Sequence, residues 1–290
     1  MSTTLTPPTP PTGPQPSPVI PPPVPPRSSA GRVVAIIAIV VGAVIIIGAV
    51  ATGVIGSIVR AAGTTDDRIV VDATGVDSLD VDVAAGDVRV LFTDTDEAVL
   101  DVTAAAGGGQ WTLDRDGDEL VVRSPDRWFG GWWFYDGPTR VVLELPESLQ
   151  GAALDATLTL SAGSLDVDGE FGTLELEVNA GELTLAGAAA EVDVSVNAGR
   201  ADLEIADVAT ADLDVSAGGL KAVFTGDAPD DVAIDVSAGS LDLAVPSGAY
   251  RVASDVSAGG LDNRLETSTQ ASRLITVTVS AGDVTLRSGR

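Results

Sequence analysis

Few side chains of this sequence could carry out chemistry. The 290 residues include no cysteine and no histidine, which excludes thiol nucleophiles, disulfides, histidine-based triads and nearly all zinc sites. An enzyme built from this chain would have to use carboxylates alone, as glycosidases do. Carboxylates are abundant, but they are also the expected solvated face of an acidic protein. We therefore predict no catalytic residues, no cofactor and no enzymatic activity.

Three carboxylates are weak candidates for a metal site. Asp214, Asp235 and Asp255 occupy the same position in three successive copies of a sequence repeat. If these copies stack as neighbouring strands, the carboxylates lie about 5 Å apart, where like charges repel each other. Weak binding of Ca²⁺ or Mg²⁺ would relieve this repulsion. The alternative is that water and salt screen the exposed carboxylates without any bound metal.

A short acidic segment is a second candidate for calcium binding. Residues 114–118, DRDGD, lie in the middle of a predicted hairpin that extends from Gln110 to Ser124. The segment lacks the ligand spacing and the terminal glutamate of an EF-hand loop. We therefore predict an acidic β-turn here.

Six aromatic side chains gather within eight residues. They make up most of the 11 aromatic residues of the chain. In a stack of repeats, large side chains can cap the open end, so the cluster could be structural. Two glycines divide it, however, and Trp and Tyr commonly anchor interfaces, stack on sugars or settle at membrane surfaces. The candidate partner-binding residues are Trp128, Phe129, Trp132, Trp133, Phe134 and Tyr135.

The elements that would position these side chains come from a repeat of about 20 residues. Each copy has a polar residue or Ala, then Ala-Gly, with apolar residues three before and two after the glycine. Polar and apolar residues alternate on both sides of the glycine, which predicts two strands joined by a tight corner. We expect the glycine to supply a positive φ there and a nearby Ser or Asn to bond the corner's backbone. The corner glycines are Gly86, Gly163, Gly181, Gly199, Gly218, Gly239, Gly259 and Gly282.

This period predicts an all-β fold, and specifically a β-solenoid. About 20 residues are too few for a strand–helix–strand unit, and a near-constant period with identical corners is typical of stacked coils. The alternative is an antiparallel meander in which the corners are hairpin turns. The gap of 77 residues between Gly86 and Gly163 leaves the start of the continuous solenoid open.

The uncharged segment from Val33 to Val59 predicts a transmembrane helix. Its 27 residues would reach about 40 Å, enough for a hydrocarbon core of about 30 Å. Arg27 and Arg32 precede it without any acid, so the positive-inside rule favours a cytoplasmic N-terminus and an extracytoplasmic C-terminal part. The alternative is a signal peptide cleaved after Ala49-Val50-Ala51, but the apolar segment continues past that point.

These features divide the chain into five predicted parts. Residues 1–26 hold 12 of the 17 prolines, which predicts a disordered tail with polyproline-II character. All 42 acidic residues lie beyond residue 60, so the outer part should repel nucleic acid. The parts are a Pro-rich cytoplasmic tail (1–32), the membrane helix (33–59), a linker (60–67), an N-terminal β region with the hairpin and the aromatic loop (68–150) and the solenoid repeats (151–290).

The repeat unit, polar-Ala-Gly-x-Leu-x-Val, resembles that of a bacterial family. Entered through VVLELP at residues 141–146 and placed behind one membrane helix, it is similar to the β-strand-repeat domains labelled putative adhesins, whose function is largely uncharacterised. The resemblance covers roughly residues 68–290. It implies an exported right-handed β-helix-like fold and a role at the bacterial surface or in envelope stress. It implies no catalytic residues.

Two functions follow as hypotheses. The first is a single-pass structural or interaction protein of the cell envelope, similar to an adhesin, that contacts an envelope protein, a glycan or the outer leaflet. The second is an envelope-stress sensor that signals through the Pro-rich tail. Deleting residues 2–26 should be silent for the first and disabling for the second. The sequence predicts neither the partner nor the oligomeric state.

Overall fold

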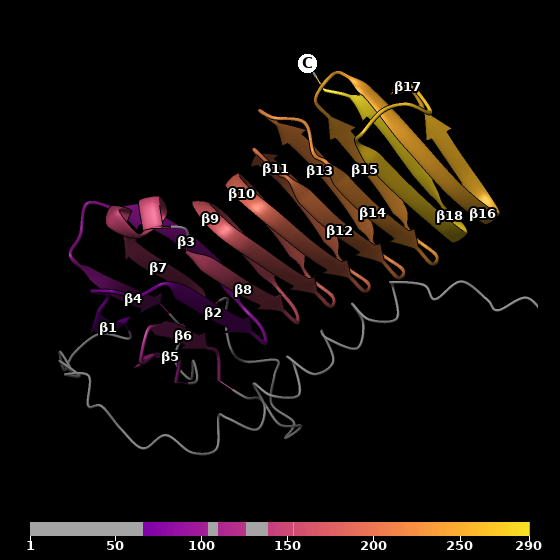
Figure 1. Ribbon diagram of the computed structural model, residues 1–290. Helices are drawn as coiled ribbons and strands as arrows, with labels where there is room; N and C mark the ends of the chain where they lie inside the picture. Colours follow the sequence, from indigo (N-terminus) through magenta and orange to yellow (C-terminus); the bar gives the residue numbers. More distant parts are fainter. Residues whose placement is uncertain (1–65, 104–109, 126–138, 153, 290) are drawn as a thin grey trace, which may run out of the picture. The chain divides into compact units, whose positions relative to one another are not determined.

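The computed structural model describes residues 66–103, 110–125, 139–152 and 154–289 (Figure 1). The predicted tail, the predicted membrane helix at 33–59 and the aromatic cluster at 128–135 lie outside these residues. Within them, no helix is both long and apolar enough to cross a bilayer. The described part is all-β, as predicted, apart from a short 3₁₀ helix, η1 (Glu147–Ala152).

Strands follow one another along almost the whole of this part. In chain order they are β1 (Asp66–Asp72), β2 (Ser78–Val83), β3 (Asp87–Thr93), β4 (Glu97–Thr103), β5 (Thr112–Asp116), β6 (Glu119–Arg123), β7 (Arg140–Pro146), β8 (Asp155–Leu160), β9 (Ser164–Val178), β10 (Glu182–Val196), β11 (Arg200–Ala206), β12 (Thr210–Val215), β13 (Gly219–Thr225), β14 (Asp231–Val236), β15 (Ser240–Val245), β16 (Ala249–Asn263), β17 (Glu266–Thr267) and β18 (Leu274–Ser288).

Each repeat forms one layer with two strand segments that meet at the corner glycine. The segments that precede the corner glycines lie side by side and form what we call the first row, while the segments that follow them form the second row. β9, β10, β16 and β18 are long because each contributes to both rows. The first row contains β2, β8, 173–178 of β9, 191–196 of β10, β12, β14, 274–279 of β18 and 251–256 of β16.

Neighbouring layers pair in parallel and in register. Between β9 and β10, Leu165 lies opposite Leu183 in the second row and Leu176 opposite Val194 in the first. A meander would give antiparallel pairs on both sides of each corner, so this alternative is wrong for the stacked repeats. Because the register does not slip between these layers, inward positions of one layer lie next to inward positions of the following layer.

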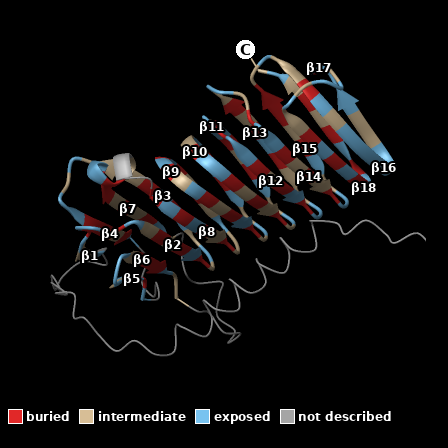
Figure 2. Ribbon diagram, in the orientation of Figure 1, coloured by how far each residue is buried: buried red, intermediate tan, exposed pale blue. Residues whose placement is uncertain are grey.

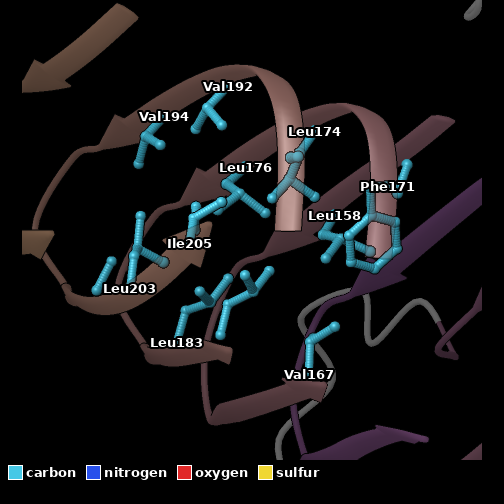
Figure 3. Packing of buried hydrophobic residues seen from close by; sticks show 14 of the residues in the cluster. Leu158, Val167, Phe171, Leu174, Leu176, Leu183, Val192, Val194, Leu203 and Ile205 are labelled. Carbon is cyan, nitrogen blue, oxygen red and sulfur yellow. The ribbon is translucent and has the colours of Figure 1, made fainter. Parts of the chain in front are cut away.

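The inward columns make one continuous hydrophobic core. Burial alternates with a period of two along the strands, and this alternation repeats from layer to layer (Figure 2). Side chains from successive layers pack against each other inside the coil, as Leu158, Leu176 and Val194 do in the first row (Figure 3). At the bend opposite the corner, Phe92 and Phe171 meet edge to face with ring centroids 6.1 Å apart.

The predicted positive φ is confirmed at only three of the eight corner glycines. Among the eight, only Gly86, Gly163 and Gly259 have a positive φ. The shared constraint is the stacking: a Cβ on Gly181 would lie 2.7 Å from the carbonyl oxygen of Gly163, and the same clash recurs at each later corner. The polar residue before the corner also forms a bond between layers, because the side-chain Nδ2 of Asn197 donates to Oδ1 of Asn179 at 2.9 Å.

The stack starts at the Gly86 layer. β3 pairs in parallel with both β7 and β9, and the Ser164 amide donates to the Gly86 carbonyl at 2.9 Å. The 77-residue gap therefore does not interrupt the stack, because β9 returns to pair with β3. It forms the end of the sheet through antiparallel pairs of β4 with β1 and β7, and through the predicted hairpin, β5–β6.

The last two layers stand in reversed order. β14 and β15 pair with β18, and β18 pairs on its other side with β16. The chain thus forms the outermost layer first and then returns to fill the space beneath it. As a result β16 lies at the end of the stack, where most of its residues are exposed (Figures 1 and 2).

Candidate interaction surfaces

The outward face of the first row is a ladder of carboxylates. Two outward columns run across the layers, one through Glu175, Asp193 and Asp212, and the other through Asp214 and Asp235. Arg123 lies near Asp80 at 3.8 Å where β2 meets β6. Parallel pairing places like charges next to each other on neighbouring strands, so this face has a strong negative potential.

The ladder changes the acidity of its members. Burial, together with Asp212 and other nearby carboxylates, raises the pKa of Asp193 to about 6. The pKa of Asp214 is raised to about 6 by burial and then by Asp212 and Asp235. Burial also raises the pKa values of Asp80, Glu175 and Asp212. Part of this face therefore takes up protons at a pH well above that of ordinary carboxylates.

The structure only partly assembles the three predicted metal candidates. Asp214 and Asp235 are direct neighbours, but Asp235 then faces Thr278, and Thr278 separates it from Asp255. The prediction of three consecutive carboxylates is wrong because the β18 layer lies between those of β14 and β16. No group of three or more acidic side chains in the described residues, including the 114–118 turn, is arranged to hold a metal ion.

The outward face of the second row differs in that it carries ion pairs. Arg89 donates to Asp166 at 3.0 Å, and Arg287 donates to Asp242 at 2.8 Å. Lys221 lies 3.9 Å from Asp202. Exposed pairs of this kind add little stability, but they offset acidic charge. The two faces of the stack therefore differ in charge.

One hollow of about 430 Å³ opens on the second row near its β7 end. The residues that line it include Arg89, Arg140, Asp166, Ser164 and Thr184. The side chains are short hydroxyls between long charged groups, and the hollow has both signs of charge. This mixture indicates a polar surface depression without selectivity for one charge.

The predicted aromatic contact site, Trp128, Phe129, Trp132, Trp133, Phe134 and Tyr135, lies outside the described residues. Sequence reasoning missed a different aromatic residue, Trp111, which is buried at the start of the stack. A Cβ on Gly86 would lie 3.4 Å from its ring. Its position one residue before β5 was the available signal, because a large side chain there can cover the first corner. Trp111 is thus part of the hydrophobic core next to the first corner.

Comparisons with solved structures find limited similarity. A putative cell adhesion protein from Clostridium sporogenes has 9% identity and a TM-score of 0.37, with 77% of this chain and 99% of that chain covered. A putative adhesin from Bacteroides fragilis has 9% identity and a TM-score of 0.42, with 78% and 98% covered. No protein-family model and no curated protein matches the sequence. These low TM-scores establish neither a shared ligand nor a shared function.

Proposed function

We propose that the chain is a structural and interaction protein of the bacterial cell envelope, with a β-solenoid outside the membrane. The segment at 33–59 is its single anchor, and the N-terminal tail is cytoplasmic. The observation that supports this function best is the difference between the two outward faces. One continuous core holds both rows rigidly, so the solenoid presents an acidic face and an ion-paired face in fixed positions.

The acidic face is suited to cationic groups of a partner in the envelope. Its carboxylates are held in register by backbone pairing, so a partner with regularly spaced basic groups would meet a pre-organised surface. Such binding depends on salt, because exposed charges are screened within about 8 Å at physiological ionic strength.

The test uses cells in which the gene has been replaced by a variant. Asp193→Asn, Asp212→Asn and Asp214→Asn together remove three charges from the acidic face, whereas Asp166→Asn, Asp202→Asn and Asp242→Asn form a matched control on the other face. We expect the first set to weaken cell adhesion and envelope integrity and the second set to leave both unchanged. Equal effects of the two sets would refute the proposal.

The tail separates this function from the sensor hypothesis. A structural and interaction role predicts that deleting residues 2–26 leaves adhesion and envelope integrity intact. A stress response that disappears on this deletion, while the surface phenotype remains, would support the sensor.

The aromatic segment is the proposed contact with an envelope protein, glycan or outer leaflet. We expect Trp132→Ala with Trp133→Ala to abolish binding to cell-envelope fragments or liposomes without lowering the melting temperature. A large loss of thermal stability would instead identify these residues as a cap.

A further inference from the structure

The outermost layer has a sheet edge that no described strand covers along most of its length. Among the described residues, β16 pairs along its length with β18 on one side. On the other side β17 covers only Ala249 and Tyr250. Within the described part of the chain, the edge from Arg251 to Asn263 therefore has no strand partner, and most of its side chains are exposed. This is the end of the stack opposite β1 (Figure 1).

The free hydrogen-bonding groups of this edge can be assigned. The Arg251 amide donates to the Arg273 carbonyl on the β18 side at 2.9 Å. Successive residues of a strand direct their backbone groups to opposite sides, so those of Val252, Ser254 and Val256 point away from β18. The Ser268 amide donates to the Tyr250 carbonyl at 2.9 Å, which agrees with this assignment.

The side chains of this layer also match an uncovered end. Val256 is the one large hydrophobic residue of the described part that is exposed, at 38%. Ser254 and Asn263 occupy inward columns that are apolar in the other complete layers, where Ile234 and Leu243 are equivalent. The edge segment has no lysine, proline or bulge, three of the devices that prevent edge pairing, and its charged residues include both signs.

We propose that this edge binds a second copy of the same chain by antiparallel pairing. A two-fold axis through Ala253 would place Val252 opposite Ser254 of the second copy, so that the outward backbone groups of both residues exchange hydrogen bonds. The same axis places Arg251 opposite Asp255 of the second copy. This self-complementary order of charges about Ala253 favours a second copy over an unrelated partner.

The other half of the edge fits the same symmetry. Ala253 and Asn263 lie five residues to either side of Ala258 in the corner, so one axis can pass both. Asp262 would then lie opposite Arg264 of the second copy, whereas within one chain Arg264 pairs with its own Asp262. The contact deepens the proposed function, on which it rests, by naming a second copy as a partner. Pairing itself does not require the membrane, so each idea can fail without the other.

The first test is disulfide trapping of the full chain, purified in detergent. The protein lacks cysteine, so a single introduced thiol reports only its own contacts. Ala253→Cys lies on the proposed axis, and Ala233→Cys is the control at the equivalent outward position of β14, inside the stack. We expect Ala253→Cys to form covalent dimers roughly tenfold faster, because its thiol meets its symmetry mate within disulfide range. Equal rates in the two variants would overturn the proposal.

The second test separates pairing from folding. Arg251→Asp should weaken dimers roughly tenfold in sedimentation, because like charges then face each other twice, and adding Asp255→Arg should restore them. Ser254→Pro removes an outward amide and should also abolish dimers, whereas Ser254→Ala should not. Far-UV circular dichroism verifies that each variant is folded. Folded Ser254→Pro that dimerises like Ser254→Ala would contradict the proposed edge.

Discussion

Replacing Gly218 with alanine tests the stacking geometry at a single atom. The added Cβ would lie 2.5 Å from the Gly199 carbonyl oxygen and 2.6 Å from Cγ1 of Val196. Both neighbours belong to the layer below and are fixed by their own pairing. The layers must therefore separate at this corner. The separation strains the bonds from the Gly219 amide to Gly199 (3.0 Å) and from the Ala217 amide to Asn197 (2.8 Å).

The expected cost can be estimated from these contacts. Overpacking costs about 1–3 kcal/mol, and each of two weakened hydrogen bonds contributes about 0.5–1 kcal/mol. We expect the free energy of unfolding to fall by about 2–5 kcal/mol. For a folded part of this size, that corresponds to a decrease in melting temperature of about 4–20 °C. Chemical and thermal denaturation followed by far-UV circular dichroism measure both quantities.

The neighbouring glycine provides the control. Gly219 has no positive φ, and the atom nearest to a Cβ there would be Oγ of Ser240 at 3.6 Å. Gly219→Ala should therefore change stability by less than about 1 kcal/mol, in either direction. If Gly218→Ala were as stable as Gly219→Ala, contact between layers would not be the reason for the corner glycines.

Acidification from pH 8 to pH 5 should stabilise the fold, because the pKa values of Asp193 and Asp214 in the folded state, about 6, are raised above their values in the unfolded state. The resulting stabilisation is complete below about pH 4 and is lost as the pH rises through 6. This difference in pKa corresponds to at most about 3 kcal/mol of stability per group, and we expect about 1 kcal/mol or less because both side chains are only half-buried. Asp193→Asn with Asp214→Asn should flatten the pH dependence of the melting temperature. An unchanged slope would show that the ladder is not responsible. Asp235→Cys with Thr278→Cys should form an intramolecular disulfide, whereas Asp235→Cys with Asp255→Cys should not, since the second pair is two layers apart. The opposite result on non-reducing peptide maps would show that the layers follow the order of the sequence. Asn197→Ala should lower stability by about 1 kcal/mol through loss of its bond to Asn179, and Ser216→Ala is the comparison at the next corner.

The sequence predicts the strands and corner of each layer because the pattern that encodes them lies within one short stretch of the chain. Apolar residues such as Val178 and Leu183, at fixed distances from a glycine, predict two strands and a corner without any knowledge of the neighbouring layer. The contact between layers that limits most corner glycines was missed because the atom that a Cβ would strike belongs to a different layer. Gly181, for example, is limited by Gly163, 18 residues earlier.

The order of the last layers was missed for a related reason. The motifs around Gly259 and Gly282 share the same Val-Ser-Ala-Gly core, so periodicity cannot distinguish their positions. A signal was nevertheless present in the inward columns. Ser254 and Asn263 replace apolar residues in one layer only, and a layer with a polar interior belongs at the end of a stack. The sequence predicts a row of carboxylates, but which carboxylates are direct neighbours depends on the order of the layers.

We propose that the folded part lies outside the membrane, and labelling of single cysteines reports this placement. Thr269→Cys lies in an exposed segment next to β17, and Ser17→Cys lies in the Pro-rich tail of a chain that otherwise lacks cysteine. Intact cells stripped of their wall are treated with a maleimide that cannot cross the membrane. We predict rapid labelling of Thr269→Cys and labelling of Ser17→Cys only after the cells are lysed. Labelling of Ser17→Cys in intact cells, with Thr269→Cys protected, would contradict the account.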